Sequence, residues 1–257
     1  MKQFSQKIRI IPKLEIKNEF LIKGVRFEGL RKIGNPVDFA NKYFKDGADQ
    51  INIIDIVASL YNRDNLYEIV NKITEKVYIP VCVGGGIKSI EHIKALLECG
   101  ADRVIVNSEA LRNIKFIDQI VQTFGSQFLT VSIEAKKIGN KYYCMMDHGR
   151  ENSNKILSDW IKQLNKYNVG EIILNSIDND GIENGFDFEL LNIASNEEFN
   201  CPKVINGGAG NFNHFMNVLE KYDIDGFSIA TALHFNKFSI KELKEFLISK
   251  KVNINPL

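Results

Sequence analysis

The sequence predicts a (β/α)8 barrel, the TIM-barrel architecture, formed by residues 1–257 as a single domain. Short apolar, β-branched runs alternate with longer amphipathic stretches along the whole chain, which is the pattern of a parallel sheet with crossover helices. The chain of 257 residues has the length of one such barrel. Motifs of the first half also recur in the second half, which indicates an internal half-barrel repeat.

Eight strand and helix pairs account for the alternation. We expect strands at 7–16, 50–56, 79–83, 103–106, 128–134, 171–174, 203–205 and 226–229. We expect helices at 36–45, 66–75, 89–98, 114–124, 156–167, 188–194, 212–221 and 240–249. Capping signals open several helices, such as Asn35 before Pro36, and Ser89. Eight pairs in this length favour the closed barrel over an open doubly wound sheet.

The two halves carry similar motifs in the same order. Val83-Gly-Gly-Gly-Ile recurs as Asn206-Gly-Gly-Ala-Gly, nearly half a chain length further on. In the same way Leu14-Glu15 corresponds to Ile133-Glu134. Equivalent motifs should therefore lie on opposite sides of one barrel.

Charge and composition exclude several classes of protein. Lys and Arg number 33 and Asp and Glu 32, so no global field indicates nucleic acid or a membrane surface. Apolar runs of about 18 residues and an apolar signal core at residues 1–9 are absent, so we expect a soluble, cytoplasmic protein. The spacing of Cys82, Cys99, Cys144 and Cys201 predicts buried, reduced thiols and neither a metal nor a cofactor.

Each half has a glycine-rich loop between a strand and a helix. Gly84-Gly85-Gly86 forms the first and Gly207-Gly208-Ala209-Gly210 the second. Glycine amides approach an anion without interference from Cβ, near a helix N-terminus. A tight turn explains one such loop, but recurrence favours two phosphate sites at one barrel mouth. A substrate phosphorylated at both ends would suit them.

Small polar residues at the ends of the strands extend these two sites, because hydroxyl and amide groups suit oxyanion recognition. Ordinary capping of the next helix would also explain Ser108 and Thr231, and Lys23 could merely solvate a surface. The expected substrate-binding and phosphate-binding residues are Lys23, Gly85, Gly86, Asn107, Ser108, Asp180, Gly181, Gly207, Gly208, Ala230 and Thr231.

Glu15 and Glu134 are the candidate catalytic residues. They end the first and fifth expected strands, which face each other across an eight-stranded barrel. Two carboxyl groups in this position can act as general acid and general base. The alternative is a pair of solvated strand-end carboxylates, since Lys17 and Lys136 follow closely.

A specific order of motifs runs along nearly the whole chain: Arg9-Ile-Ile-Pro, Lys23-Gly-Val, Gly47-Ala-Asp, Asp55, Ala58-Ser59, Gly84-Gly-Gly-Ile, Gly100-Ala-Asp, Asn107-Ser, Phe124-Gly-Ser-Gln, Glu171-Ile-Ile-Leu-Asn-Ser-Ile-Asp, Gly207-Gly-Ala-Gly and His234-Phe. This order resembles the cyclase subunit of imidazole glycerol phosphate synthase, a barrel of histidine biosynthesis. In that family ammonia from a separate glutaminase subunit passes through the barrel. There it cleaves and cyclises a doubly phosphorylated ribulosyl aminoimidazole into imidazole glycerol phosphate and an aminoimidazole carboxamide ribotide.

The resemblance implies a carbon–nitrogen lyase that pairs with a glutaminase subunit as a heterodimer. It also places the family's two catalytic aspartates at Glu15 and Glu134, so the chain departs from the family pattern at both positions. Glutamate is longer by one C–C bond, roughly 1.5 Å. A misplacement of about 1 Å in a catalytic group can lower a rate on the order of 10²-fold.

A second departure concerns the ring of four charged residues that gates ammonia in this family. The matching positions hold Arg9, Gln50, Arg103 and Glu171, so one carboxylate faces two guanidinium groups. We therefore expect a gate of different strength.

Other family positions are kept, namely Asn107, Gln127 and Asp180. His148 stands where the family often has a small residue, in the loop after the fifth strand. This change should alter how the substrate is covered.

Three functions remain open from the sequence. The chain is the cyclase with glutamates in place of aspartates, or a paralogue that uses the ammonia path to amidinate a nucleotide-linked or surface sugar, or a non-catalytic scaffold for a glutaminase. The two glycine loops and Asn107 argue against the scaffold. The related isomerase of the pathway is also a half-repeated barrel, but Phe124-Gly-Ser-Gln and Asn175-Ser-Ile-Asp fit the cyclase better.

Overall fold

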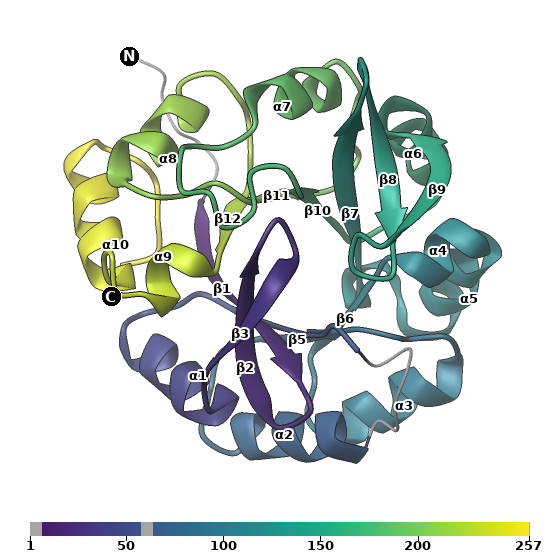
Figure 1. The fold of residues 1–257 in the computed structure, drawn as a ribbon. Coiled ribbons are helices and arrows are strands. Elements are labelled where there is room, and N and C mark those ends of the chain that lie inside the picture. Colours follow the sequence, from purple (N-terminus) through teal and green to yellow (C-terminus); the bar gives the residue numbers. More distant parts are fainter. Residues whose placement is uncertain (1–6, 58–63, 257) are drawn as a thin grey trace.

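A computed structural model describes residues 7–57 and 64–256, and the Ala58-Ser59 motif lies outside these described residues. Eight parallel strands form a closed barrel (Figure 1). They are β1 (Arg9–Lys17), β4 (Ile51–Asp55), β5 (Val81–Gly84), β6 (Arg103–Val106), β7 (Leu129–Ile138), β10 (Glu171–Ser176), β11 (Lys203–Asn206) and β12 (Gly226–Ile229). Closure occurs where β12 pairs with β1, with Arg9 opposite Gly226. The predicted (β/α)8 barrel is confirmed.

Helices surround the barrel on all sides (Figure 1). The eight expected helices are present, with ends shifted by a turn or less: α1 (Pro36–Lys45), α2 (Asp64–Thr74), α3 (Ile90–Glu98), α5 (Lys115–Phe124), α6 (Leu157–Leu164), α7 (Phe188–Ser195), α8 (Phe212–Leu219) and α10 (Ile240–Ser249). The side chain of Asn35 caps α1 by accepting a hydrogen bond from the Val37 amide at 2.8 Å. Shorter turns of helix were not anticipated: α4 (Ser108–Arg112), the 3-10 turn η1 (Ser126–Phe128) and α9 (Thr231–His234).

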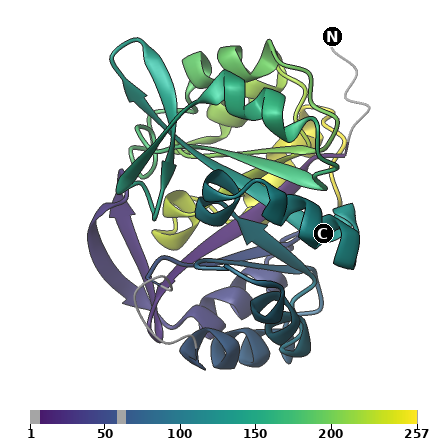
Figure 2. The same cartoon turned by 90° about the vertical axis from the view of Figure 1, so that its right-hand side faces the viewer.

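Two β-hairpins at one end of the barrel were also missed by the sequence pattern. They are β2 (Phe20–Val25) with β3 (Glu28–Gly34), and β8 (Lys141–Met146) with β9 (Glu151–Ile156). Because β2 continues antiparallel from β1 and β8 from β7, both hairpins rise from the carboxyl ends of barrel strands. Figure 2 shows them projecting from the same end of the molecule. The returning strands β3 and β9 are mostly polar and carry no apolar run, whereas β2 and β8 contain short apolar runs that the prediction did not assign to strands.

The apolar core has two parts. The larger part packs the outer faces of the strands against the helices and includes the fully buried Trp160 and Phe215. The smaller part lies inside the barrel, where Ile11, Cys82 and Ile105 pack with Ile173 and Val204. This inner apolar layer separates the two ends of the barrel from each other.

The structure tests three expectations drawn from composition: the state of the cysteines, membrane-spanning helices and metal-binding clusters. All four cysteines are free thiols. Cys82 and Cys144 are buried, but the expectation of burial is wrong for Cys99 and Cys201, which are half-buried at the ends of elements. Within the described residues, no helix combines the length and apolar character needed to cross a bilayer. No cluster of His, Cys, Asp and Glu side chains in that same part of the chain could hold a metal ion.

In both glycine loops another segment of backbone passes so close that only glycine fits. At Gly85 φ is +105°, and a Cβ would lie 2.1 Å from the carbonyl oxygen of Asp55. At Gly208 φ is +107°, and a Cβ would lie 2.0 Å from the carbonyl oxygen of Gly185. Each half of the barrel therefore needs glycine at the equivalent loop, whatever the loop binds.

Gly85→Ala should lower the free energy of unfolding by about 3 kcal/mol or more, because it adds a backbone clash to the strain of positive φ. Gly139→Ala is the matched control, since Gly139 has φ +61° and a Cβ added there would meet no atom within 4 Å. It should lose about 1 kcal/mol, from the left-handed conformation alone. Urea unfolding measures both values, and equal losses would contradict the crossing at Gly85.

Candidate active site

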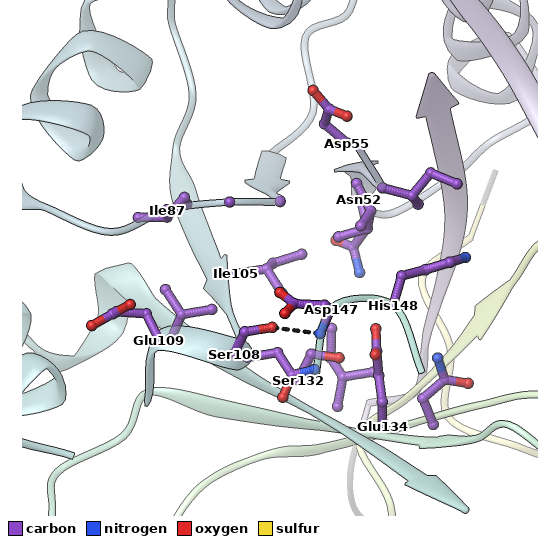
Figure 3. Close-up of a pocket in the computed structure, with 18 of the residues that line it drawn as sticks. Asn52, Asp55, Ile87, Ile105, Ser108, Glu109, Ser132, Glu134, Asp147 and His148 are labelled. Atoms are coloured by element: carbon purple, nitrogen blue, oxygen red, sulfur yellow. Dashed lines mark hydrogen bonds between the residues drawn. The ribbon is translucent and has the colours of Figure 1, made fainter. Parts of the chain in front are cut away.

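The carboxyl ends of the barrel strands enclose a cavity of about 890 Å³, counting its open mouth (Figure 3). Residues of the first half form one wall, and they include four of the predicted anion ligands: Gly85, Gly86, Asn107 and Ser108. Neutral polar side chains from five strands line its inner part: Asn52, Ser132, Asn175, Asn206 and Ser228. The structure therefore brings the first predicted anion site together at the barrel mouth.

A second hollow of about 260 Å³ lies beside the first. Six predicted residues line it: Asp180, Gly181, Gly207, Gly208, Ala230 and Thr231. Asn206 and Ser228 line both hollows, so the two adjoin. The half-barrel repeat thus places two glycine-walled hollows side by side in one mouth.

Helix capping does not explain Ser108 and Thr231. They are the first residues of α4 and α9, and the cap positions are Asn107 (φ −138°, ψ −82°) and Ala230 (φ −122°, ψ −80°). Neither cap residue makes a side-chain capping hydrogen bond. The Ser108 hydroxyl instead accepts a hydrogen bond from the Asp147 amide at 2.9 Å. The first turns of α4 and α9 therefore have no side-chain cap, and their first residues line the two hollows.

Glu15 lies in a buried chain of alternating charges. Lys13 Nζ lies 2.6 Å from its Oε1, Lys23 Nζ lies 2.9 Å from its Oε2, and Lys23 Nζ also lies 2.5 Å from Asp180 Oδ1. Burial alone would raise the pKa of Glu15, but Lys13 and Lys23 hold that pKa well below its ordinary value. Burial would likewise lower the pKa of Lys23, but the carboxylates of Glu15 and Asp180 raise it. Glu15 and Lys23 are therefore both charged near neutral pH.

Glu134 has the opposite environment. It is 8% exposed, and its Oε2 has no hydrogen-bond partner within the described residues. Burial raises the pKa of Glu134 to about 7, although the nearby Lys13 ammonium opposes this rise. Figure 3 shows its carboxyl group directed into the cavity, on the side of Asp147 and His148. The solvated-carboxylate alternative is therefore wrong for both glutamates, and their environments separate their pKa values as in acid–base sites.

Lys13 is a site residue that the sequence reasoning missed. It lines the cavity beside Asn52 and is 7% exposed. The signal was present in the sequence, because residues two apart in a strand share a face and Lys13 precedes Glu15 by two.

The two hairpins meet over the mouth through aromatic stacking. The rings of Phe27, between β2 and β3, and His148, between β8 and β9, are parallel within 10° at a centroid separation of 4.1 Å. Burial lowers the pKa of His148 to about 4, so its imidazole is neutral at pH 7. The effect of His148 on how a substrate is covered stays a prediction.

The predicted ring of four residues assembles at the opposite end of the barrel. Arg9 Nη1 donates to Gln50 Oε1 at 3.2 Å, and Arg9 also forms an ion pair with Glu171. Arg103 Nη1 lies 3.4 Å from Glu171 Oε2. One carboxylate therefore faces two guanidinium groups, as expected from Gln50. Gln127 is exposed in η1, away from the mouth cavity.

Comparison with known proteins decides the family. A family model described as "Histidine biosynthesis protein" matches residues 9–239. The chain belongs to this family. The range that matches the family model runs from β1 through β12, and so includes both hollows and the four-residue ring.

Similar curated proteins carry one name, "Imidazole glycerol phosphate synthase subunit HisF". The protein of Natranaerobius thermophilus is 40% identical over 246 residues, which is 96% of this chain and 98% of the relative. That of Campylobacter concisus is 40% identical over 246 residues, with 96% and 97% covered. That of Legionella pneumophila is 44% identical over 209 residues, with 81% and 98% covered. The sequence resemblance to this cyclase family is confirmed.

Glu134→Gln should stabilise the protein more at pH 8 than at pH 4.5. The pKa of Glu134 is raised to about 7 in the folded state. The stability associated with this residue is therefore fully present at pH values below its pKa in the unfolded chain, and it is lost as the pH rises through 7. Since a rise in the pKa from about 4.3 in the unfolded chain to about 7 corresponds to up to about 4 kcal/mol, the gain at pH 8 should approach that size. Urea unfolding at both pH values measures it, with the exposed Glu28→Gln as control. A gain that does not change with pH would contradict the raised pKa.

Proposed function

We propose that this chain is the cyclase subunit of imidazole glycerol phosphate synthase, a lyase acting in the cytoplasm. It uses ammonia to convert a doubly phosphorylated ribulosyl aminoimidazole into imidazole glycerol phosphate and an aminoimidazole carboxamide ribotide. In this proposal residues 1–257 form one barrel domain that pairs with a glutaminase subunit, and the reaction needs neither a metal nor a cofactor.

The observation that carries the proposal is the pair of adjoining glycine-walled hollows in one mouth, in a chain related to several HisF subunits. One phosphate would bind at Gly86 and Asn107, and the other at Gly207 and Thr231. Backbone amides of such loops and helix starts bind phosphate without a net positive charge on the protein. The glycine loops alone are also explained by their backbone crossings, so the support comes from the two hollows together.

The interior of the barrel supports an ammonia path. The ring of Arg9, Gln50, Arg103 and Glu171 would form the entrance, on the end where the glutaminase docks. The inner apolar layer above it favours neutral ammonia over the ammonium ion, because burying a charge in an apolar environment is strongly unfavourable. Ammonia would leave this layer beside Lys13 and Glu134.

Glu134 is the residue proposed for proton transfer. A pKa of about 7 allows a carboxyl group both to donate and to accept a proton near neutral pH. Its position in the larger hollow would place it against the ribulosyl part of the substrate, between the two phosphates.

A second candidate function is favoured by one observation. Glu15 stands at the position of a family catalytic aspartate, and both of its carboxylate oxygens form ion pairs, one with Lys13 and one with Lys23. This arrangement suits a paralogue in which the barrel and ammonia path are kept while the acceptor is a nucleotide-linked or surface sugar to be amidinated.

Glu134→Gln should lower the turnover of ribulosyl aminoimidazole with ammonium by about 10²-fold or more, since the amide cannot exchange a proton. Substrate affinity should stay within about twofold, because phosphate contacts dominate binding. A twofold change corresponds to less than about 0.5 kcal/mol, since a tenfold change is about 1.4 kcal/mol. Glu109→Gln, in the same cavity lining, is the matched control and should keep its turnover. Binding without any turnover in the wild-type protein would contradict the cyclase and favour the second candidate.

Glu171→Gln should impair the transfer of ammonia more than the reaction itself, because it leaves two guanidinium groups without a carboxylate partner at the proposed entrance. We expect glutamine-dependent turnover, with the glutaminase present, to fall at least about tenfold more than turnover with free ammonium. Equal losses in the two assays would remove the gate from the proposal.

A further inference from the structure

Lys13 is a buried cation in the middle of the site. Among the barrel-strand residues that the structure describes around the cavity, it is the one cation. Besides Glu134, the polar side chains along this inner surface are neutral, namely Asn52 on the adjacent strand and the amides and hydroxyls of the other strands. Desolvating an ammonium group here is unfavourable unless it has a defined partner.

The partner of Lys13 is Glu15. The two catalytic candidates, Glu15 and Glu134, differ in their ion pairs. Each oxygen of Glu15 faces one lysine, at 2.6 Å for Lys13 and 2.9 Å for Lys23. Glu134 forms no ion pair of this kind within the described residues. Glu15 Oε1 and Glu134 Oε2 both lack a hydrogen bond, so the ion pairs are what distinguish the two glutamates. The charges of Lys13, Glu15, Lys23 and Asp180 cancel, so this cluster is complete without Glu134.

We propose that Lys13 is a positioning residue of this site, whose ammonium group holds Glu15 as a permanent carboxylate and so leaves Glu134 as the one carboxyl group that exchanges protons with the substrate. The inference rests on the proposed function for its substrate. It gives unequal roles to two glutamates that the sequence places in equivalent positions of the two half-barrels.

The proton-transfer step then balances with Glu134 alone. Ammonia adds to the keto carbon of the ribulosyl group, a C–N bond forms, and the carbonyl π pair moves to oxygen. Protonated Glu134 gives its proton to that oxygen and becomes a carboxylate. The ammonium nitrogen of the adduct then returns one proton to Glu134, which leaves a neutral carbinolamine and the original acid. Glu15 gains and loses no proton in this sequence.

Groups from several elements act on the pKa of Glu134. These are Lys13 and Glu15 on β1, Asp180 after β10 and the backbone amide of Gly149 between β8 and β9. Lys23 on β2 and His148 between β8 and β9 act on the pKa of Glu15, and His234 in α9 interacts with Lys23, Glu15 and Lys13. Burial keeps both histidines neutral, with the pKa of His148 near 4 and that of His234 near 3. With Lys13 removed, the cluster carries one net negative charge. The pKa values of both Glu15 and Glu134 should then rise.

The test is a carbon-13 NMR titration of the full chain labelled in its glutamate carboxyl carbons, without substrate. The Glu134 and Glu15 resonances are assigned by their loss in Glu134→Gln and Glu15→Gln. In the wild-type protein Glu134 should titrate near pH 7, and Glu15 should stay ionised from pH 5 to 9. In Lys13→Met the Glu134 midpoint should rise by about one unit or more, and Glu15 should begin to titrate in this range.

Two controls separate charge from packing. Lys13→Arg keeps the cation and should restore the wild-type titrations, whereas Lys88→Met changes an exposed lysine of the same cavity and should leave them unchanged. If Lys13→Met does not fold, the neutral polar Lys13→Gln takes its place. Unchanged titration of both glutamates in the neutral variant would overturn the inference.

Turnover then distinguishes this inference from the proposed function. At constant free ammonia, the decline of kcat at high pH should move upward in Lys13→Met by the same amount as the Glu134 midpoint. A wild-type chain with no turnover would remove the proposed function, while the NMR titration would still decide the role of Lys13. A shifted titration with an unshifted pH profile would overturn the assignment of Glu134 as the exchanging group.

Discussion

The pairing of β12 with β1 is the constraint on which the rest of the structure depends. It closes eight parallel strands into a ring, so the carboxyl ends of all eight strands meet at one mouth. Gly85 and Gly208, which are far apart in the sequence, thereby wall two adjoining hollows. The same closure brings Glu15 and Glu134 to opposite sides of this mouth, and the four-residue ring to the other end.

Burial then gives two chemically identical side chains different properties. Glu15 and Glu134 are both buried, yet two ammonium groups hold Glu15 as a carboxylate, whereas burial raises the pKa of Glu134 to about 7. A buried ionic cluster such as Lys13 with Glu15 contributes little net stability, because the loss of hydration offsets the attraction. Its presence at the centre of the mouth is therefore better explained by the chemistry of the site than by folding.

The sequence predicts the barrel and its eight helices well, because apolar periodicity records which faces are buried. It does not reveal the two hairpins, because their returning strands β3 and β9 are mostly polar and carry no such record. The contact of Phe27 with His148 could therefore not be foreseen. The glycine loops and the residues after β6 and β12 could be placed from the repeat. The ion pairs of Lys23 with Glu15 and Asp180 could not, because they depend on how a hairpin folds back over the mouth.

A crystal structure of the chain with bound ribulosyl aminoimidazole would test the central claim most directly, namely that one mouth holds both ends of one doubly phosphorylated substrate. We predict one phosphate at Gly86 and Asn107, the other at Gly207 and Thr231, and the ribulosyl keto oxygen within hydrogen-bond distance of Glu134. Both phosphates outside the two hollows, or a ligand that leaves Glu134 without a contact, would contradict this account.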